Sequence, residues 1–148
     1  MFSTRRRTLI LALGAAALAC FAPLASGADP KVSKAEWQAI KRVISEQLTA
    51  FKSGNGGKAF GYATPAIQAQ FGDAENFLAM VRGAYAALLE ARYTEFLEGA
   101  VIDGVIVQPL RLIAPDNTVR VALYTMEKQR GNWRISGCVI APSTVQAA

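Results

Sequence analysis

The chain has 148 residues, with 16 basic and 11 acidic side chains, a formal net charge of +5, two cysteines and no histidine. The absence of histidine excludes a His–Asp dyad, a Ser–His–Asp triad and a histidine-ligated metal site. The length suits one compact domain and is too short for two.

The first 28 residues have the order of a secretory signal peptide. Three arginines, Arg5–Arg7, precede an uncharged, alanine-rich stretch that runs from Thr8 to Ala28 and ends in small residues. This order predicts export with cleavage after Ala28, and "RRRTLI" also resembles a twin-arginine signal for folded proteins. The alternative is a membrane anchor, but glycine and proline interrupt the stretch. We expect a periplasmic or secreted protein with no stable membrane span after signal removal.

Removal of residues 1–28 would take away three arginines and no acid, so the net charge falls by three, from +5 to +2. The basic excess therefore lies largely in the signal and argues little for nucleic acid, which we do not expect as a partner. Cys20 would leave as well, and Cys138 then has no partner for an internal disulfide. Because no histidine is present to generate a thiolate, we interpret Cys138 as a small apolar side chain in a strand.

A long amphipathic helix is predicted to begin behind the capping box Ser33–Glu36 and to end at the "SGNGG" that starts at Ser53. Apolar residues recur in it at spacings of three and four and form one stripe. The stripe consists of Trp37, Ile40, Ile44, Leu48 and Phe51.

Two shorter helices are expected next. Thr64 and Pro65 fit the N-cap and first position of one helix, which ends at Gly72. Asp73 caps the other, which Gly83 is expected to interrupt.

From about Arg92 onward, β-branched and aromatic residues dominate, and short polar turns separate four stretches. The pattern predicts four consecutive antiparallel strands. The turns are "DG" at Asp103–Gly104, "PDN" at Pro115–Asn117 and "RGN" at Arg130–Asn132. Gly99 and Pro109 lie within strands, where a bulge or an edge position is the usual explanation.

The register of the last hairpin follows if Arg130–Gly131 is a two-residue turn. The resulting pairs are Glu127 with Arg134, Thr125 with Ser136 and Leu123 with Cys138. One face then carries Val119, Val121, Leu123, Cys138 and Ile140. The other carries Ala122, Tyr124, Met126, Trp133, Ile135 and Val139. Both faces are apolar, so we expect helices to cover one and a further element or a second copy of the chain to cover the other.

Four stretches carry a resemblance to known proteins. They are "AF" at Ala50–Phe51, "AFGYATPAIQAQFG" at Ala59–Gly72, "FLAMVRGAY" at Phe77–Tyr85 and "NWRISGC" at Asn132–Cys138. In this order the chain resembles the nuclear-transport-factor-2-like superfamily and, within it, an uncharacterised family of bacterial secreted proteins. The resemblance implies one domain over residues 29–148, an α+β cone of the cystatin-like type. In it, a long N-terminal helix and short helices pack on a curved four-stranded antiparallel meander and can enclose a pocket. It implies no known activity.

No catalytic set, cofactor or metal ligand is predicted from the residues. The acids fall mostly in turns or alternate along strands, as solvated charges do. The glycine-rich "GNGGKAF" from Gly54 to Phe60 lacks the spacing of a phosphate-binding loop, and its plain role is to end one helix and begin the next.

The candidate pocket residues are polar side chains that could share one face of the predicted sheet, joined by one from the helices. They are Gln108, Thr125, Arg134 and Ser136 from the sheet and Tyr85 from the helical side. Arg134 could bind a carboxylate or phosphate. The alternative, which we favour, is a solvated cross-strand pair of Glu127 with Arg134.

Two functions stay open. The first is an exported, non-catalytic domain that binds a small ligand or an envelope protein and forms a homodimer. The second is an isomerase or dehydratase that uses an isolated carboxylate together with tyrosines. A buried carboxylate of raised pKa near Tyr85, Tyr93 or Tyr124 would favour the second.

Overall fold

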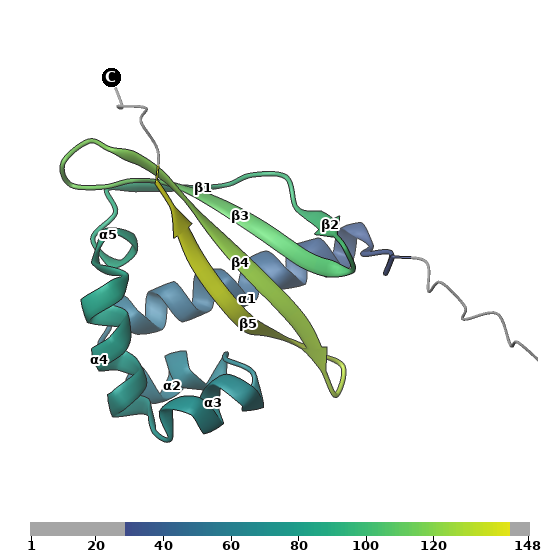
Figure 1. Cartoon of the computed structure of the whole chain (residues 1–148), viewed down its shortest axis with the longest axis horizontal. Helices are drawn as coiled ribbons and strands as arrows, with labels where there is room; N and C mark the ends of the chain where they lie inside the picture. The colour runs from purple at the N-terminus through teal and green to yellow at the C-terminus, as the bar shows by residue number, and fades with distance from the viewer. Residues whose placement is uncertain (1–28, 143–148) are drawn as a thin grey trace, which may run out of the picture.

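A computed structural model describes residues 29–142, in which a layer of helices packs on one face of an antiparallel sheet (Figure 1). The helices are α1 (Lys34–Lys52), α2 (Gly56–Gly61), α3 (Pro65–Phe71), α4 (Ala74–Ala84) and α5 (Ala86–Leu89). The strands are β1 (Tyr93–Phe96), β2 (Ala100–Ile102), β3 (Val105–Ile113), β4 (Val119–Gln129) and β5 (Asn132–Ala141). The predicted α+β class is confirmed. The predicted signal peptide, residues 1–28, lies outside the described residues.

Helix α1 forms as its sequence predicts. The Ser33 hydroxyl accepts a hydrogen bond from the Glu36 N–H at 3.2 Å, and the Glu36 carboxylate accepts from the Ser33 N–H at 3.0 Å. This capping box satisfies two backbone donors that a helix start would leave open. None of the helices in residues 29–142 has the length and apolar character needed to cross a bilayer.

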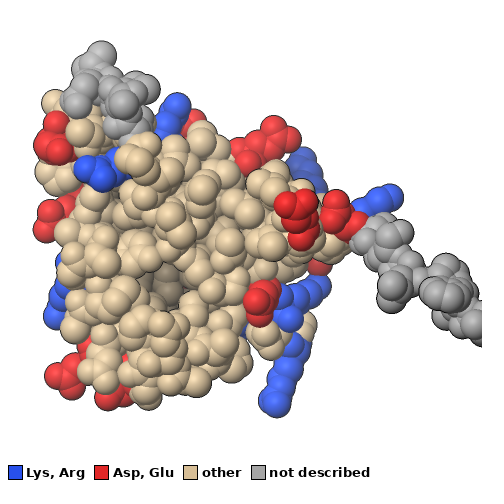
Figure 2. All heavy atoms as spheres, viewed as in Figure 1, with Lys and Arg blue, Asp and Glu red and all other residues tan. Residues whose placement is uncertain are grey.

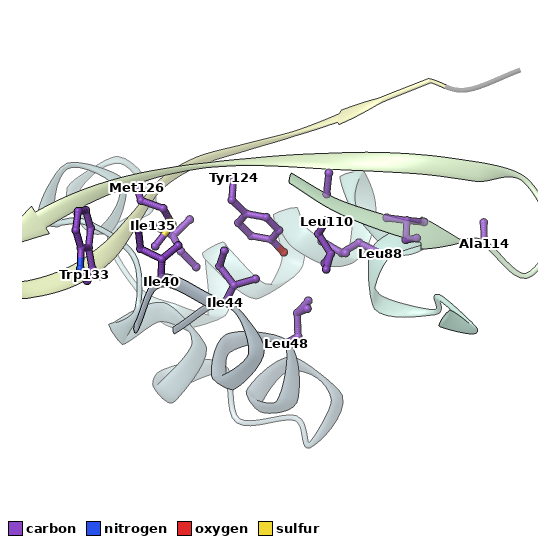
Figure 3. Packing of buried hydrophobic residues seen from close by; sticks show 12 residues of the cluster. Ile40, Ile44, Leu48, Leu88, Leu110, Ala114, Tyr124, Met126, Trp133 and Ile135 are labelled. Atoms are coloured by element: carbon purple, nitrogen blue, oxygen red, sulfur yellow. The ribbon is translucent and has the colours of Figure 1, made fainter. Parts of the chain in front are cut away.

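The core lies between α1 and the inner face of the sheet. Ile40, Ile44 and Leu48 of α1 are buried and point toward strand residues, as Figure 3 shows. The facing strand residues include Leu110, Tyr124 and Met126. Each large apolar side chain buried in this way stabilises the fold by about 1.5–3 kcal/mol.

The shorter helices begin at their predicted caps. The Thr64 hydroxyl accepts from the Ile67 N–H, and the Asp73 carboxylate accepts from the Asn76 N–H. The expected interruption lies two residues beyond Gly83, because α4 continues through it to Ala84 and Tyr85 separates α4 from the single turn of α5.

The first predicted strand is divided into β1 and β2, so the sheet has five strands where four were expected. Both pair with β3, and the strand order is β1-β3-β4-β5. Gly99 lies in the gap, packed under the Trp37 ring, and a Cβ atom there would overlap that ring. The gap is therefore fitted to a bulky side chain of α1.

Pro109 of β3 lies opposite the same gap. The Leu97 N–H donates to the Pro109 carbonyl at 3.1 Å, but proline has no N–H to return the bond. The Gln108 side chain supplies the missing donor, since its Nε2 donates to the Leu97 carbonyl at 2.8 Å. Proline is tolerated within β3 because the sheet is already open at this position.

The last hairpin has the predicted turn but not the predicted register. Arg130 and Gly131 both have positive φ, and Glu127 pairs with Arg134 as expected. Ser136 is then an extra residue that forms a β-bulge, because Met126 pairs with Ile135 whereas Thr125 pairs with Gly137. The predicted pairs of Thr125 with Ser136 and of Leu123 with Cys138 are therefore wrong.

The bulge exchanges the two faces of β5 beyond Ile135. Cys138 pairs with the buried Tyr124 and faces the helices, whereas the sequence placed it on the opposite side. Val139 pairs with Leu123 and turns outward, where 65% of it is exposed. A one-residue change of register moves every following side chain to the other face.

We expect Gly99→Ala to lower the free energy of unfolding by about 1–3 kcal/mol, because its methyl group would overlap the Trp37 ring. Urea denaturation followed by tryptophan fluorescence measures this. The control is Gly83→Ala in α4, where nothing lies within 4 Å of the added atom and the helix gains up to about 1 kcal/mol. Equal stability of the Gly99→Ala variant and the wild type would contradict the close packing.

Candidate functional site

A hollow of about 270 Å³ lies between the helical layer and the β5 side of the sheet. Figure 2 shows it as an opening in the uncharged part of the surface, in the region between α4 and β5 of Figure 1. Its lining consists of Gln47, Phe51, Ala63, Ile67, Gln70, Phe71, Phe77, Met80, Val81, Tyr85, Leu88, Tyr124, Ile135, Ser136, Gly137 and Cys138.

The outer wall is an aromatic cluster centred on Phe77 of α4. Its ring lies 5.3–5.9 Å, between centroids, from the rings of Phe51, Phe60 and Phe71. These rings pack α2, α3 and α4 against one another and against the end of α1 through favourable tilted and edge contacts, and α2, α3 and α4 together form an arm.

The arm is attached to the edge of β5 at Ile135. The Ile135 N–H donates to the Tyr62 carbonyl at 2.9 Å, and the Thr64 N–H donates to the Ile135 carbonyl at 3.0 Å. The chain then leaves the edge at Pro65 and enters α3. Ser136, Gly137 and Cys138 therefore line the hollow.

Two tyrosines and a thiol form the inner end. The Tyr85 hydroxyl donates to the Cys138 carbonyl at 2.6 Å, which joins the end of α4 to β5. Tyr124 is only 1% exposed, and among the described residues its hydroxyl has no hydrogen-bond partner. Its neighbour is the Cys138 thiol, a weak acceptor.

Burial sets the protonation of all three groups. It raises the pKa of Tyr85 and raises the pKa of Tyr124 well above its ordinary value. Burial also raises the pKa of the Cys138 thiol to about 12. At neutral pH the inner end is therefore uncharged, and the thiol is a poor nucleophile.

None of the described residues that line the hollow is Asp, Glu, Lys or Arg. The acids with shifted pKa lie elsewhere, on the surface. Hydrogen bonds from Lys128 and Ser33 lower the pKa of Glu36 to about 2, and those from Thr118 lower the pKa of Asp116. A buried carboxylate with a raised pKa, which would favour an enzyme, is not found among residues 29–142.

The structure brings together two of the five candidate residues. Tyr85 and Ser136 both line the hollow. Thr125 lies just behind it and accepts a hydrogen bond from the Ser136 hydroxyl at 3.0 Å. Gln108 of β3 pairs with Tyr124 of β4, the residue next to Thr125. Because successive residues of a strand point to opposite faces, Gln108 and Thr125 do not share a face of the sheet.

Gln108 and Arg134 are engaged in holding the fold. Gln108 bridges the gap between β1 and β2, as described above. The Arg134 guanidinium donates to the Gly61 carbonyl at the end of α2. Arg134 and Glu127 are strand partners as predicted, but the structure of residues 29–142 has no ion pair between them.

A second hollow, of about 360 Å³, lies at the start of α1 and includes Gln108 and Trp37. The exposed side chains of Lys34, Gln38 and Glu98 form much of its wall. In the described part of the chain no three His, Cys, Asp or Glu side chains gather to hold a metal ion.

Residues 33–148 match the family model described as a domain of unknown function, DUF4864. The chain belongs to this DUF4864 family. No curated protein matches it. The match spans every described helix and strand, so the hollow lies within the DUF4864 domain, whose function is unknown.

The pocket candidates predicted from the sequence of this DUF4864 domain omit Tyr124 and Cys138, although the enzyme hypothesis names Tyr124. The sequence predicts the correct face of the sheet for Tyr124. It could have been recognised as a pocket residue because it places a phenol between Ala122 and Met126 on an otherwise apolar face of β4. Cys138 was assigned to the opposite face because the bulge was not foreseen.

Iodoacetamide should modify Cys138 of the folded protein at least roughly 100-fold more slowly than in guanidinium chloride at about pH 8, because burial suppresses the thiolate. Peptide mass spectrometry distinguishes Cys138 from Cys20. The folded-state rate should keep rising above about pH 9, beyond the ordinary range of a free thiol. Similar rates in the folded and unfolded states would contradict the raised pKa of the half-buried Cys138 thiol.

Proposed function

We propose that this protein is an exported, non-catalytic domain that binds a small apolar ligand in the hollow between α4 and β5. The observation that carries this proposal is a lining of apolar and aromatic side chains with a few polar groups and no charge among the described residues. Ligand sites are typically concave and apolar, with a small number of polar groups that orient the ligand. The volume of about 270 Å³ suits a compact molecule of a few fused or linked rings.

Export and superfamily membership are parts of the same proposal. The basic, apolar and small-residue order of residues 1–28 supports export to the periplasm or beyond. The helices packed on a bent antiparallel sheet support membership of the nuclear-transport-factor-2-like superfamily. An envelope protein is the alternative partner to a small ligand.

The enzyme hypothesis has less support. Tyr85 and Tyr124, two of the three tyrosines that this hypothesis names, line the hollow, whereas Tyr93 is exposed on the outer face. However, a base is needed beside them, and the lining contains no carboxylate. Proton abstraction from a substrate in this hollow therefore lacks an acceptor among the described residues.

Met80→Trp should fill the mouth of the hollow and weaken binding of the neutral fluorophore N-phenyl-1-naphthylamine at least roughly tenfold. Fluorescence titration measures the affinity, and the wild type should show saturable binding of one molecule per chain. Ala79→Trp is the matched control, because it adds the same bulk to an exposed position of α4. Unsaturable binding by the wild type, or equal affinity in the Met80→Trp variant, would refute this site.

We propose that the outer face of the sheet forms a homodimer. All four large hydrophobic side chains that the described residues leave exposed lie on this face by strand register. They are Tyr93, Ile102, Val105 and Val139. Together they make this face the part of the described surface where a second chain could bury apolar area.

A second copy of the chain suits this face because its charges are balanced. Glu95 and Arg111 form an ion pair on the same face. A twofold interface places a patch against its own copy, so an acid and a base side by side can exchange partners reciprocally. A patch of one sign would repel itself.

Val139→Asp should convert the dimer into a monomer, because it places two carboxylates in a twofold apolar interface. Light scattering during gel filtration gives the mass in solution. The charge itself should cost the isolated chain little, about 0.5 kcal/mol or less, because Val139 is largely exposed. Ala69→Asp on α3 is the control and should leave the mass unchanged. A monomeric wild type would refute the interface.

A further inference from the structure

We infer that the ligand of the hollow is an uncharged molecule that places one oxygen acceptor against the Tyr124 hydroxyl. This inference rests on the proposed binding function and adds the chemical class of the ligand. It follows from two independent observations, an unpartnered buried hydroxyl and a lining without charge.

The Tyr124 hydroxyl is the first observation. Tyr124 lines the hollow from the middle of β4, packed between the sheet and α1, and is almost completely buried. Figure 3 shows its hydroxyl directed from the strand toward the helical layer, on the same side as Leu88. Buried hydroxyls normally have a partner, and an unpartnered one in the wall of a ligand-sized hollow is a donor that a bound molecule can satisfy.

The other polar groups of the inner wall are already engaged. The Tyr85 hydroxyl donates to the Cys138 carbonyl, the Ser136 hydroxyl donates to Thr125, and the Gln47 amide nitrogen donates to the Ala59 carbonyl. Gln70 is exposed and lies toward the solvent. Tyr124 is therefore the inner hydroxyl whose donor is unused among the described residues, with only the weakly accepting Cys138 thiol beside it.

The protonation of Tyr124 fixes the direction of the hydrogen bond. Burial raises its pKa well above the ordinary value, so it carries its proton at neutral pH and can donate. A hydroxyl, carbonyl or ether oxygen of the ligand can accept that bond.

The absence of charge among the lining residues is the second observation. A carboxylate or ammonium group brought into this hollow would lose its hydration and find no counter-ion among the residues that line it. An uncharged ligand avoids that loss. Charged relatives of a good ligand should therefore bind poorly even when their ring system fits.

Three probes of one ring system separate these points: naphthalene, 2-naphthol and 2-naphthoate. Their dissociation constants are measured by fluorescence titration or competition with the wild type and with Tyr124→Phe. The matched control is Tyr93→Phe, which removes a hydroxyl from the exposed outer face. We expect 2-naphthol to bind at least roughly tenfold more tightly than 2-naphthoate, because of the uncompensated charge. Tyr124→Phe should weaken 2-naphthol about three- to tenfold and leave naphthalene unchanged, the effect of losing one uncharged hydrogen bond.

The stability of Tyr124→Phe is a second readout. Removing an unpartnered buried hydroxyl should leave the midpoint of thermal unfolding unchanged or higher, so the variant stays folded and testable. Tight binding of 2-naphthoate, or an equal effect of Tyr124→Phe on naphthalene and 2-naphthol, would overturn the ligand class and leave the hollow as a binding site. Binding of none of the three probes would overturn the binding site itself and the inference with it.

Discussion

The β-bulge at Ser136 decides which side chains face the hollow. Gly137 permits it, because a Cβ atom at this position would come within 2.8 Å of the Thr125 hydroxyl oxygen. The Ser136 hydroxyl donates to the same oxygen, so one threonine holds both residues of the irregular step. Beyond this point Cys138 faces the helices and Val139 faces outward. The pocket wall and the exposed outer face both follow from that change of side.

The hollow exists because the helical layer meets the sheet at separated places. Helix α1 packs closely on the inner face through Ile40 and Ile44. The arm of α2, α3 and α4 is attached to β5 through Ile135, and the end of α4 is attached through the Tyr85 hydroxyl. Side chains of the Phe77 cluster stiffen the arm between these attachments. The cavity is therefore bounded by hydrogen bonds at its edges and by aromatic rings along its outer wall.

Much of the fold could be predicted because its signals are local. The capping box at Ser33, the N-caps at Thr64 and Asp73, and the turns at Asp103–Gly104 and Arg130–Gly131 depend on residues close in sequence. The division of the first strand depends on Trp37 packing against Gly99, which lies more than sixty residues away. Contacts of that kind leave no periodic pattern in the sequence.

The site was harder to predict than the fold for the same reason. The sequence indicates Tyr85 and Ser136 because each is a polar residue within an apolar stretch, and both line the hollow. Gln108 meets the same criterion, but its amide compensates for the missing N–H of Pro109. Arg134 was considered for anions, yet it donates to a helix carbonyl at Gly61. Polar residues that complete the backbone of a sheet cannot be separated from ligand residues by sequence alone.

Nuclear Overhauser contacts between bound N-phenyl-1-naphthylamine and the methyl groups of the protein test the central claim most directly. If the bulge sets the pocket wall, the ligand should contact the methyl groups of Met80, Val81 and Ile135 and none of Val139 or Leu123. Contacts with Val139, together with none to Met80, would show that the Val139 side chain faces the ligand and would contradict the account.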